Sequence, residues 1–196
     1  RKLFGNNPIV WTFPRREHPP IVLDMAMTPV ALGKVLRARS EGANIPEAWG
    51  FLDRDGNPTI DPDVAMKGIV PAIGGYKGIG MITASNILAG VMAGSAHTGD
   101  VAVGRRGQFF LLMNPGIFRD IDDYFDDIEN MVQQIRSAGE EDALPDQRVY
   151  LPGEIEQKTM DERLAEGVVS YPGSVVRSLQ QVGEDVGVPF DCQEVN

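Results

Sequence analysis

The sequence has little cysteine, no long apolar run and a shortage of positive charge, and each shortage excludes a class of protein. Its 196 residues contain one cysteine, Cys192, so no disulfide can form within the chain and a cysteine-based zinc site is excluded. A single thiol is typical of a reducing compartment, and we expect a cytoplasmic protein. The longest apolar stretch, residues 79–93, is short for a bilayer and contains polar side chains, so no membrane segment is predicted.

Negative charge dominates, but unevenly. The formal net charge is −10, from 18 Lys and Arg against 28 Asp and Glu. Residues 1–119 carry 13 basic and 9 acidic side chains, whereas residues 120–196 carry 5 and 19. Phosphate neutralisation dominates nucleic-acid affinity, so we expect no nucleic-acid partner. An anionic ligand should bind the first part of the chain.

The apolar patterning predicts strands at 9–13 and 21–23, paired as a hairpin, and a fully buried strand at 109–113 that ends at Asn114-Pro115-Gly116. Turn and cap signals add a turn at Asp53-Arg54-Asp55-Gly56 and an acidic loop at 139–147. The helices we expect begin at caps or carry an apolar stripe. They lie at 30–38 after a Thr28 cap and Pro29, after Asp61-Pro62, at 78–94 (buried on every side), at 121–135 (acidic residues in water), at 154–167 and at 173–186.

The first candidate for chemistry is the stretch from Ile21 to Pro29. An apolar strand ends on Asp24, and a helix is predicted to begin a few residues later. Ligands of α/β proteins bind beyond the carboxyl ends of strands, and a helix N-terminus offers free N–H groups to an anion. The alternative is that Asp24 only caps the turn and Thr28 the helix.

The second candidate is Gly74-Gly75-Tyr76-Lys77-Gly78-Ile79-Gly80. Closely spaced glycines let the backbone approach a ligand, and Lys77 brings a positive charge to a helix N-terminus. The pattern is neither a dinucleotide fingerprint, because Thr83 replaces the third glycine, nor a P-loop. The alternative is that the glycines serve packing and that Lys77 is merely exposed.

Other polar residues are weaker candidates. His18 and His97 lie in loops without an evident partner, Arg105-Arg106 precede the expected buried strand, and Cys192 has no activating neighbour. The acidic run from Asp120 to Asp127 is interpreted as a solvated helix face, and residues 53–56 do not have EF-hand spacing. We therefore predict no metal site.

Taken together, several short motifs resemble a known family, the type-2 malate/L-lactate dehydrogenases, a non-Rossmann group that includes ureidoglycolate dehydrogenase. They occur in the family's order along nearly the whole chain. The motifs are Gly5-Asn6-Asn7-Pro8, Leu23-Asp24-Met25-Ala26, Gly33-Lys34-Val35, Ile45-Pro46-Glu47-Ala48-Trp49-Gly50, Asp55-Gly56-Asn57-Pro58-Thr59 with Asp61-Pro62, Gly75-Tyr76-Lys77-Gly78-Ile79-Gly80, Gly107-Gln108 with Asn114-Pro115, and Tyr150-Leu151-Pro152-Gly153-Glu154.

The resemblance implies an α/β fold with a mixed, mainly antiparallel sheet flanked by helices, similar to L-sulfolactate dehydrogenase. It also implies a homodimeric oxidoreductase that uses NAD or NADP and acts on a small 2-hydroxy acid, such as malate, lactate or ureidoglycolate, or on the matching 2-oxo acid. The family's cofactor contacts correspond to Asp24, Met25 and Ala26, to Lys77, and to Gly153 and Glu154.

Two further expectations concern the organisation of the chain. Residues 1–147 would form most of a dinucleotide-binding domain, and residues 148–196 a helical segment that packs on a region preceding this sequence. The family's catalytic histidine is expected in that preceding region, so the role is not transferred to His18 or His97. The loop at 96–106 is shorter than in ureidoglycolate dehydrogenase. A competing hypothesis is a non-catalytic oligomerisation module with a vacant anion site.

Overall fold

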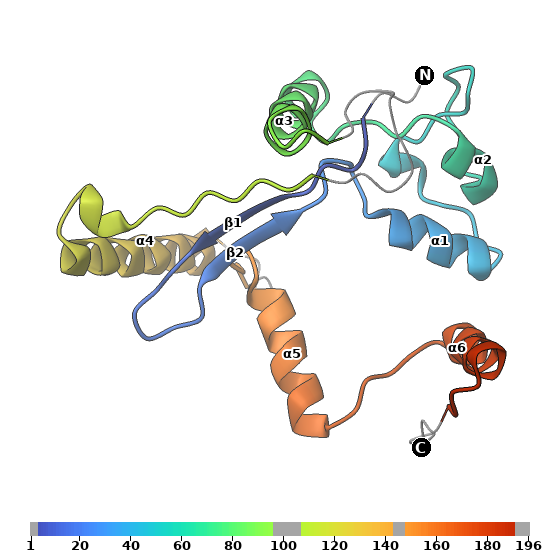
Figure 1. The fold of residues 1–196 in the computed structure, drawn as a ribbon. Coiled ribbons are helices and arrows are strands. Elements are labelled where there is room, and N and C mark those ends of the chain that lie inside the picture. Colours follow the sequence, from blue (N-terminus) through green and yellow to red (C-terminus); the bar gives the residue numbers. More distant parts are fainter. Residues whose placement is uncertain (1–3, 96–106, 143–147, 191–196) are drawn as a thin grey trace. The chain divides into compact units, whose positions relative to one another are not determined.

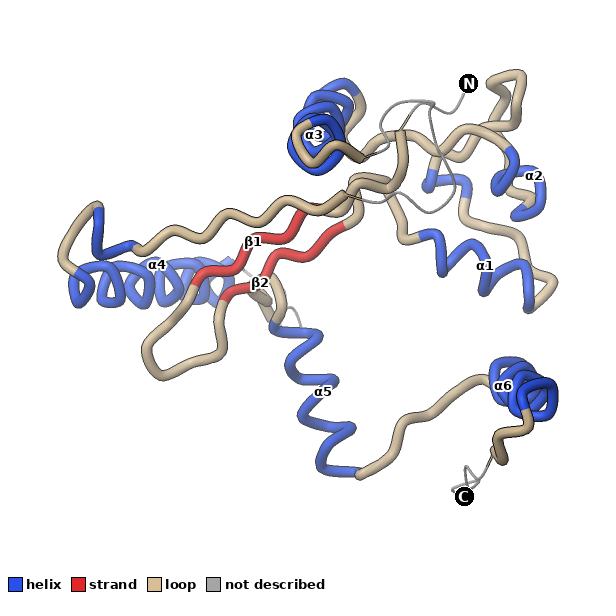
Figure 2. Tube along the Cα trace, in the orientation of Figure 1, coloured by secondary structure: helices blue, strands red, loops and turns tan. Residues whose placement is uncertain are grey.

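The structure is a computed structural model that describes residues 4–95, 107–142 and 148–190. The chain divides into two compact units, Arg1–Gln157 and Lys158–Asn196. Figure 1 gives the order of helices and strands, and Figure 2 shows that helices outnumber the two paired strands in the part described. Helices beside a small antiparallel sheet confirm the expected α/β class.

The sheet is a hairpin of β1 (Ile9–Phe13) and β2 (Ile21–Met25). The strands are antiparallel, with Ile9 opposite Met25 and Trp11 opposite Leu23. The predicted hairpin is confirmed. Strand β2 continues two residues beyond the predicted end, so that Asp24 lies within the strand, opposite Val10.

The first hydrophobic core, which we call the helical cluster, is formed by α1 (Leu32–Ser40), η1 (Glu47–Trp49), α2 (Pro62–Lys67) and the loops between them. Its buried residues come from one continuous stretch of the chain: Val30, Val35, Ile45, Phe51 and Ala65. The predicted start of α2 is confirmed, because the Asp61 carboxylate accepts hydrogen bonds from the N–H groups of Asp63 and Val64.

The predicted cap of α1 is wrong. Helix α1 begins after Ala31, and no side chain caps it. The Thr28 hydroxyl donates instead to the side-chain oxygen of Asn6, 2.8 Å away. The nearby turn at residues 53–56 is confirmed, because the Asp53 carboxylate accepts from the N–H groups of Asp55 and Asn57.

The predicted all-round burial of residues 78–94 is also wrong. The segment forms α3 (Tyr76–Asn86) and η2 (Ile87–Val91), but of the helical residues only Gly78, Ile82 and Gly90 are buried. Ile79, Val91 and Met92 are 46, 54 and 66% exposed. The described residues cover one side of this helix, and the apolar pattern on its other sides remains in solvent.

Residues 109–113 form no strand, contrary to prediction. Their apolar side chains lie between 43 and 89% exposed, so the run is extended but unpaired. An apolar run becomes a buried strand only when neighbours pair with its backbone and cover both faces. The expected stop after the run does occur, as η3 (Pro115–Ile117), where the Asn114 side chain accepts from Gly116 N–H.

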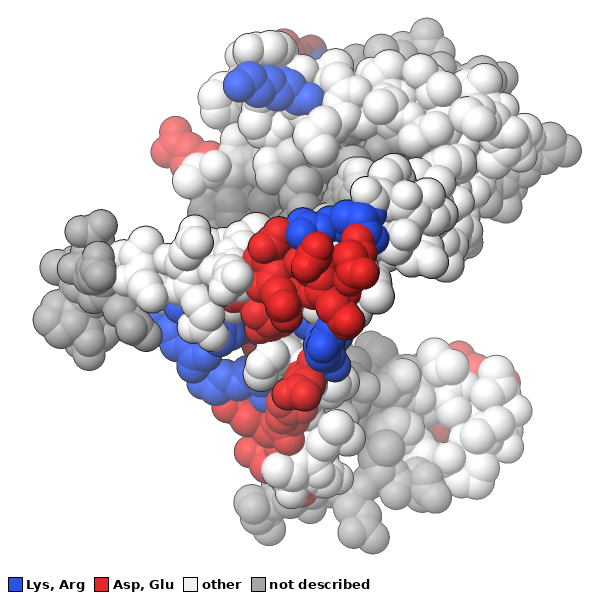
Figure 3. Space-filling view, turned by 90° about the vertical axis from the view of Figure 1, so that its left-hand side faces the viewer, with Lys and Arg blue, Asp and Glu red and all other residues white. Residues whose placement is uncertain are grey.

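The second core, which we call the hairpin–α4 cluster, joins β2 to the amphipathic helix α4 (Ile121–Asp142). It buries Ile21, Ile128, Val132 and Leu151, with Tyr124 packed against them. The predicted helix is confirmed, and its exposed aspartates gather at its N-terminal end with arginines beside them (Figure 3). The acidic loop predicted from residue 139 is wrong up to Asp142, where α4 ends; residues 143–147 lie outside the described residues.

The last two helices are α5 (Glu154–Glu166) and α6 (Gly173–Val186), and both are confirmed within one residue. Helix α5 begins in the first unit, and α6 lies in the second. Among the helices in the described residues, none combines the length and the apolar character needed to cross a bilayer.

Candidate functional site

The first two candidate segments meet at the end of β2. Met27, which directly follows Asp24-Met25-Ala26, donates its N–H to the carbonyl of Asn6 (3.0 Å) and accepts from the N–H of Ile73 (3.1 Å). The chain that leads into Gly74 and Lys77 is therefore bonded to the backbone two residues beyond the end of the strand. The Asn6-Asn7 segment also contacts α3, because the Asn7 side chain donates to the carbonyl of Ile82 at 3.4 Å.

The glycines before α3 have conformations that require glycine. Gly74 and Gly75 both have φ of +62°, and a Cβ on either would meet nothing within 4 Å. Gly78 differs, because a Cβ there would lie 1.8 Å from the carbonyl oxygen of Ile73. The packing alternative therefore holds for Gly78, while Gly74 and Gly75 leave open backbone in front of a helix N-terminus.

Lys77 lies in the first turn of α3 and is exposed. No carboxylate among the described residues pairs with its ammonium group. The first N–H groups of a helix lack partners within the helix, so this position combines free donors with a positive charge. Such an arrangement can hold a phosphate.

The third segment, the turn from Leu151 to Glu154, lies against β2 near its start. The N–H of Val22 donates to the carbonyl of Pro152 (3.1 Å). Gly153 has φ of +90°, and a Cβ on it would lie 3.1 Å from Val22 Cβ. Gly153 is thus held two strand positions from Asp24, as close as a glycine allows.

Asp24 itself is exposed, whereas Met25 and Ala26 are half-buried. Within the described residues no group donates a hydrogen bond to the Asp24 carboxylate, so the capping alternative has no support there. Asp24 and Met25 lie in β2, Ala26 directly follows it, and Gly153 lies against Val22 of the same strand, while the loop before Lys77 is bonded to Met27 beyond its end.

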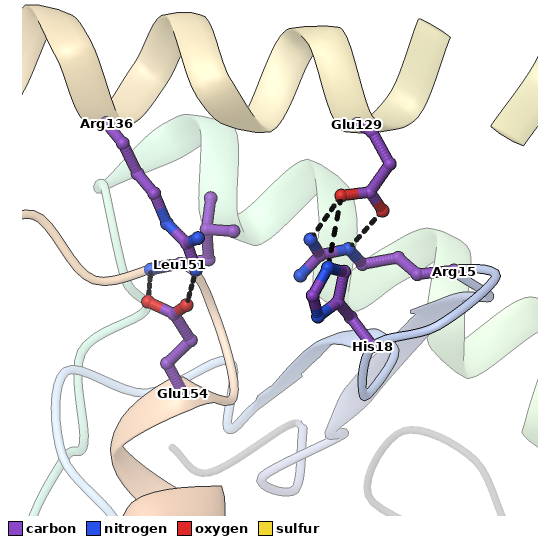
Figure 4. A network of polar contacts seen from close by, with 6 residues as sticks. All are labelled: Arg15, His18, Glu129, Arg136, Leu151 and Glu154. Carbon is purple, nitrogen blue, oxygen red and sulfur yellow. Dashed lines mark hydrogen bonds and ion pairs between the residues drawn. The ribbon is translucent and has the colours of Figure 1, made fainter. Parts of the chain in front are cut away.

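Glu154 has two partners (Figure 4). One carboxylate oxygen accepts from the N–H of Leu151 at 2.8 Å, and the other pairs with Arg136 of α4. Partial burial raises the pKa of Glu154, but the bonds from Leu151 and Arg136 outweigh burial and leave the pKa below its ordinary value. Glu154 is therefore ionised at neutral pH, and both of its carboxylate oxygens are engaged by Leu151 and Arg136.

A second ion pair lies nearby on α4 (Figure 4). Arg15, whose side chain is 5% exposed, makes two hydrogen bonds to Glu129, at 2.7 and 2.6 Å. These bonds hold the pKa of Glu129 below its ordinary value. Sequence reasoning missed both pairs; the available signal was a glutamate and an arginine on the apolar face of an amphipathic helix, at positions 129 and 136.

The remaining candidates lie away from this end of β2 or outside the described residues. His18 lies in the connection between the strands, at the opposite end of the hairpin from Met25, and its Nε2 is 3.9 Å from Glu129. His97, Arg105-Arg106 and Cys192 fall outside the described residues. No group of three His, Cys, Asp or Glu side chains that could hold a metal occurs in the described parts of the chain.

Comparison with known proteins places the chain in a family. The sequence profile of the family described as malate/L-lactate dehydrogenase matches residues 1–180. The chain belongs to this family. This match confirms the resemblance that the motifs indicated.

Two curated relatives illustrate the range of the family. L-sulfolactate dehydrogenase of Methanothermobacter thermautotrophicus is 30% identical over 203 residues, covering 100% of this chain and 56% of the relative. The NAD(+) ureidoglycolate dehydrogenase of Escherichia coli K12 is 30% identical over 173 residues, covering 84% of this chain and 48% of the relative. The chain spans about half the length of the curated relatives it matches.

A solved structure is similar in fold. Sulfolactate dehydrogenase from Methanocaldococcus jannaschii superposes with a TM-score of 0.76 at 26% identity, over 96% of this chain and 54% of that one. This likeness confirms the expected L-sulfolactate dehydrogenase-like fold.

Proposed function

We propose that this chain forms the dinucleotide-binding part of an oxidoreductase that transfers a hydride between NAD or NADP and C2 of a small 2-hydroxy acid. The observation that carries the proposal, in a chain of this family, is that two other candidate segments are bonded to the stretch that holds Asp24–Ala26. Pro152, before Gly153-Glu154, bonds to Val22 of β2, and Ile73, before Lys77, bonds to Met27 just beyond the strand. Curated relatives whose names specify a cofactor use NAD(+) or NADP(+).

The residues present fit a dinucleotide. Gly74 and Gly75 leave space in front of α3 that any side chain would occupy, and Lys77 adds a positive charge there. The exposed Asp24 and the half-buried Met25 and Ala26 offer a carboxylate and apolar surface at the end of β2, where Met27 bonds to Ile73 of the segment before Lys77. An anionic pyrophosphate near Lys77, with the rest of the cofactor along the end of β2, matches this order of charges.

When bound, the nicotinamide accepts or donates the hydride. The part of this chain is to bind and orient. Lys77 and the helix N-terminus hold the anionic group. The backbone from Asp24 to Ala26 forms one wall of the site, because β1 pairs with Asp24 and Met25 and the N–H of Met27 bonds to Asn6. Relatives are named for malate, sulfolactate and ureidoglycolate, all small hydroxy acids, and we propose the same substrate class here.

The exposed apolar surface of α3 and η2 supports an association with further protein. We propose that the protein is a cytoplasmic homodimer, as the resemblance implies, and that Ile79, Val91 and Met92 become covered in the assembled enzyme. The same surface is what the competing hypothesis of an oligomerisation module would use. Binding of a dinucleotide distinguishes the two functions, because a module with a vacant anion site would bind none.

Calorimetric titration of the chain with NADH and with NADPH tests the proposal. Lys77→Ala should weaken binding of the preferred dinucleotide by about 1.5–3 kcal/mol, the loss of one charge-assisted hydrogen bond. Lys67→Ala, which removes an exposed lysine from the end of α2, is the matched control and should bind like the parent chain. Absence of binding by the parent chain, or equal affinity of the Lys77 variant and the parent, would refute the assignment.

A further inference from the structure

The inner face of α4 carries two charges of opposite sign, one on each side of a buried valine. Glu129, Val132 and Arg136 follow one another at spacings of three and four, so they share one face of the helix. Val132 is 0% exposed within the hairpin–α4 cluster. Glu129 holds Arg15 from the strand connection, and Arg136 holds Glu154 from the turn before α5 (Figure 4).

Arg136 fixes this turn through Glu154. One Glu154 oxygen accepts the N–H of Leu151, and the other is held by Arg136, so the carboxylate bridges α4 and the backbone of the turn. Leu151 is 6% exposed and packs with Ile21 and Val132. The turn is therefore attached to α4 by both an apolar and a charged contact.

The turn from Leu151 to Glu154 is bonded to β2 through Val22. Its Pro152 carbonyl accepts the N–H of Val22, and Gly153 lies so close that a Cβ would be 3.1 Å from both Val22 Cβ and the Val22 carbonyl oxygen. A shift of the turn away from the strand breaks this hydrogen bond, and a side chain at position 153 would force such a shift. Val22 precedes Asp24 by two residues on the same strand.

We propose that Arg136 is a positioning residue for the cofactor site. From a place 15 residues beyond the start of α4, it holds the turn from Leu151 to Glu154 against Val22 of β2 and so restrains the strand that carries Asp24 and leads into Met25 and Ala26. This inference rests on the proposed function, because it assigns a purpose to the contact only if a dinucleotide binds there.

The exposure of the pair predicts where its effect is felt. The side chains of Arg136 and Glu154 remain 32 and 22% exposed, and ion pairs in contact with water add little to overall stability. The pair joins α4 to one turn, so its loss should favour local opening of that turn without unfolding either core. The removal of Arg136 should therefore alter ligand affinity and local backbone protection more than the melting temperature.

The test compares Arg136→Gln, Arg136→Lys and Arg119→Gln in the full chain. Arg119 provides a matched control, because it also pairs with a carboxylate of α4 (Asp127, 2.6 Å), and its loss changes the net charge equally. Within the described residues it makes no hydrogen bond or ion pair with the hairpin or the turn. For each variant we would measure NADH affinity by calorimetry, amide hydrogen exchange at Val22 and Leu151, and the melting temperature.

Arg136→Gln should weaken NADH binding by about tenfold and speed exchange at Val22 and Leu151, Arg136→Lys should recover part of both, and Arg119→Gln should change neither. The inference is overturned if Arg136→Gln binds like the parent, if the two Gln variants lose equal affinity, or if affinity falls without faster exchange at Val22 and Leu151. A parent chain that binds neither NADH nor NADPH refutes the proposed function itself, and the inference with it.

Discussion

The helical cluster and the hairpin–α4 cluster are both small apolar cores, but they differ in the separation of their segments along the chain and in the burial of their ion pairs. The helical cluster buries five apolar residues from one stretch of chain, and its ion pairs, Arg37–Glu41 and Arg39–Asp63, lie in solvent. The hairpin–α4 cluster assembles segments more than a hundred residues apart and places a charged pair on each side of its core.

The difference concerns what each kind of contact specifies. Apolar burial is not directional, so local chain connectivity is needed to give a unique arrangement in the helical cluster. Remote segments have no such connection, and bidentate contacts such as Arg15–Glu129 restrict how the hairpin can lie on α4. The candidate residues Asp24, Met25, Gly153 and Glu154 lie on the region that uses the more directional contacts, whereas Lys77 lies on α3.

The largest effect should come from the helical cluster. Phe51→Ala removes a side chain that is 1% exposed, and it should lower the free energy of unfolding of this region by about 3–5 kcal/mol. Val132→Ala in the other cluster loses two methylene equivalents and should cost about 2 kcal/mol. Urea unfolding measures the loss of stability, and amide hydrogen exchange shows which cluster is affected. If exchange in β2 were as fast in the Phe51 variant as in the Val132 variant, the two clusters would not be separate.

The junction at Ile73 can be broken selectively. Gly78→Ala would place a Cβ 1.8 Å from the Ile73 carbonyl, so the backbone that bonds to Met27 must shift, at a cost of about 2–3 kcal/mol. Gly80→Ala, where a Cβ meets nothing within 4 Å, should instead stabilise α3 by about 1 kcal/mol. Thermal unfolding of both variants checks the opposite signs, and a shared sign would show that the close approach at Gly78 has no effect.

The charged contacts of the hairpin–α4 cluster should show a pH dependence. Arg15 lowers the pKa of Glu129, so the stabilisation is complete above the unfolded-state pKa and is lost as the pH falls through the folded-state pKa. Glu129→Gln should therefore be less stable than the parent by about 1–2 kcal/mol at neutral pH. In urea titrations the difference should shrink below about pH 4, near the ordinary glutamate pKa. A difference that stays constant with pH would mean that the ionised carboxylate is not what stabilises the contact.

The smallest effect tests a local contact in the helical cluster. Asp61→Ala removes the carboxylate that caps α2 and should cost about 1 kcal/mol, whereas Asp61→Asn should cost little because asparagine caps nearly as well. Thermal melts at neutral pH suffice to compare them. Equal losses in both variants would assign the effect to charge instead of capping.

The sequence predicts elements whose partners are close by or whose pattern is complete. The β-branched and apolar runs at 9–13 and 21–23, with the proline-bounded connection between them, were enough for the hairpin, and the apolar stripe from Ile121 to Ile135 was enough for α4. The strand at 109–113 and the buried helix at 78–94 were wrong because an apolar run reports only a tendency to be covered, and the described neighbours cover one side or none.

Other features depend on contacts that no local pattern encodes. Thr28 precedes a proline, as a helix cap often does, but its hydroxyl donates to the side-chain oxygen of Asn6, 22 residues away. The pairs Arg15–Glu129 and Arg136–Glu154 join separate segments, so they could be identified only from the three-dimensional structure. The candidate residues Asp24, Lys77 and Gly153 were found from motifs, while the reason they converge, the hydrogen bonds of Met27 and Val22, is tertiary.

The register of the hairpin also has a spectroscopic consequence. The chain contains two tryptophans, and each region has one: Trp11 opposite Leu23 on the hairpin, and Trp49 packed against the helical cluster. Trp11 is 48% exposed and directly follows Val10, the residue opposite Asp24. Trp49 packs against the core that contains Phe51. Single Trp→Phe variants thus give the intrinsic fluorescence of each region separately, and reduced nicotinamide, which absorbs where tryptophan emits, should quench Trp11 by energy transfer.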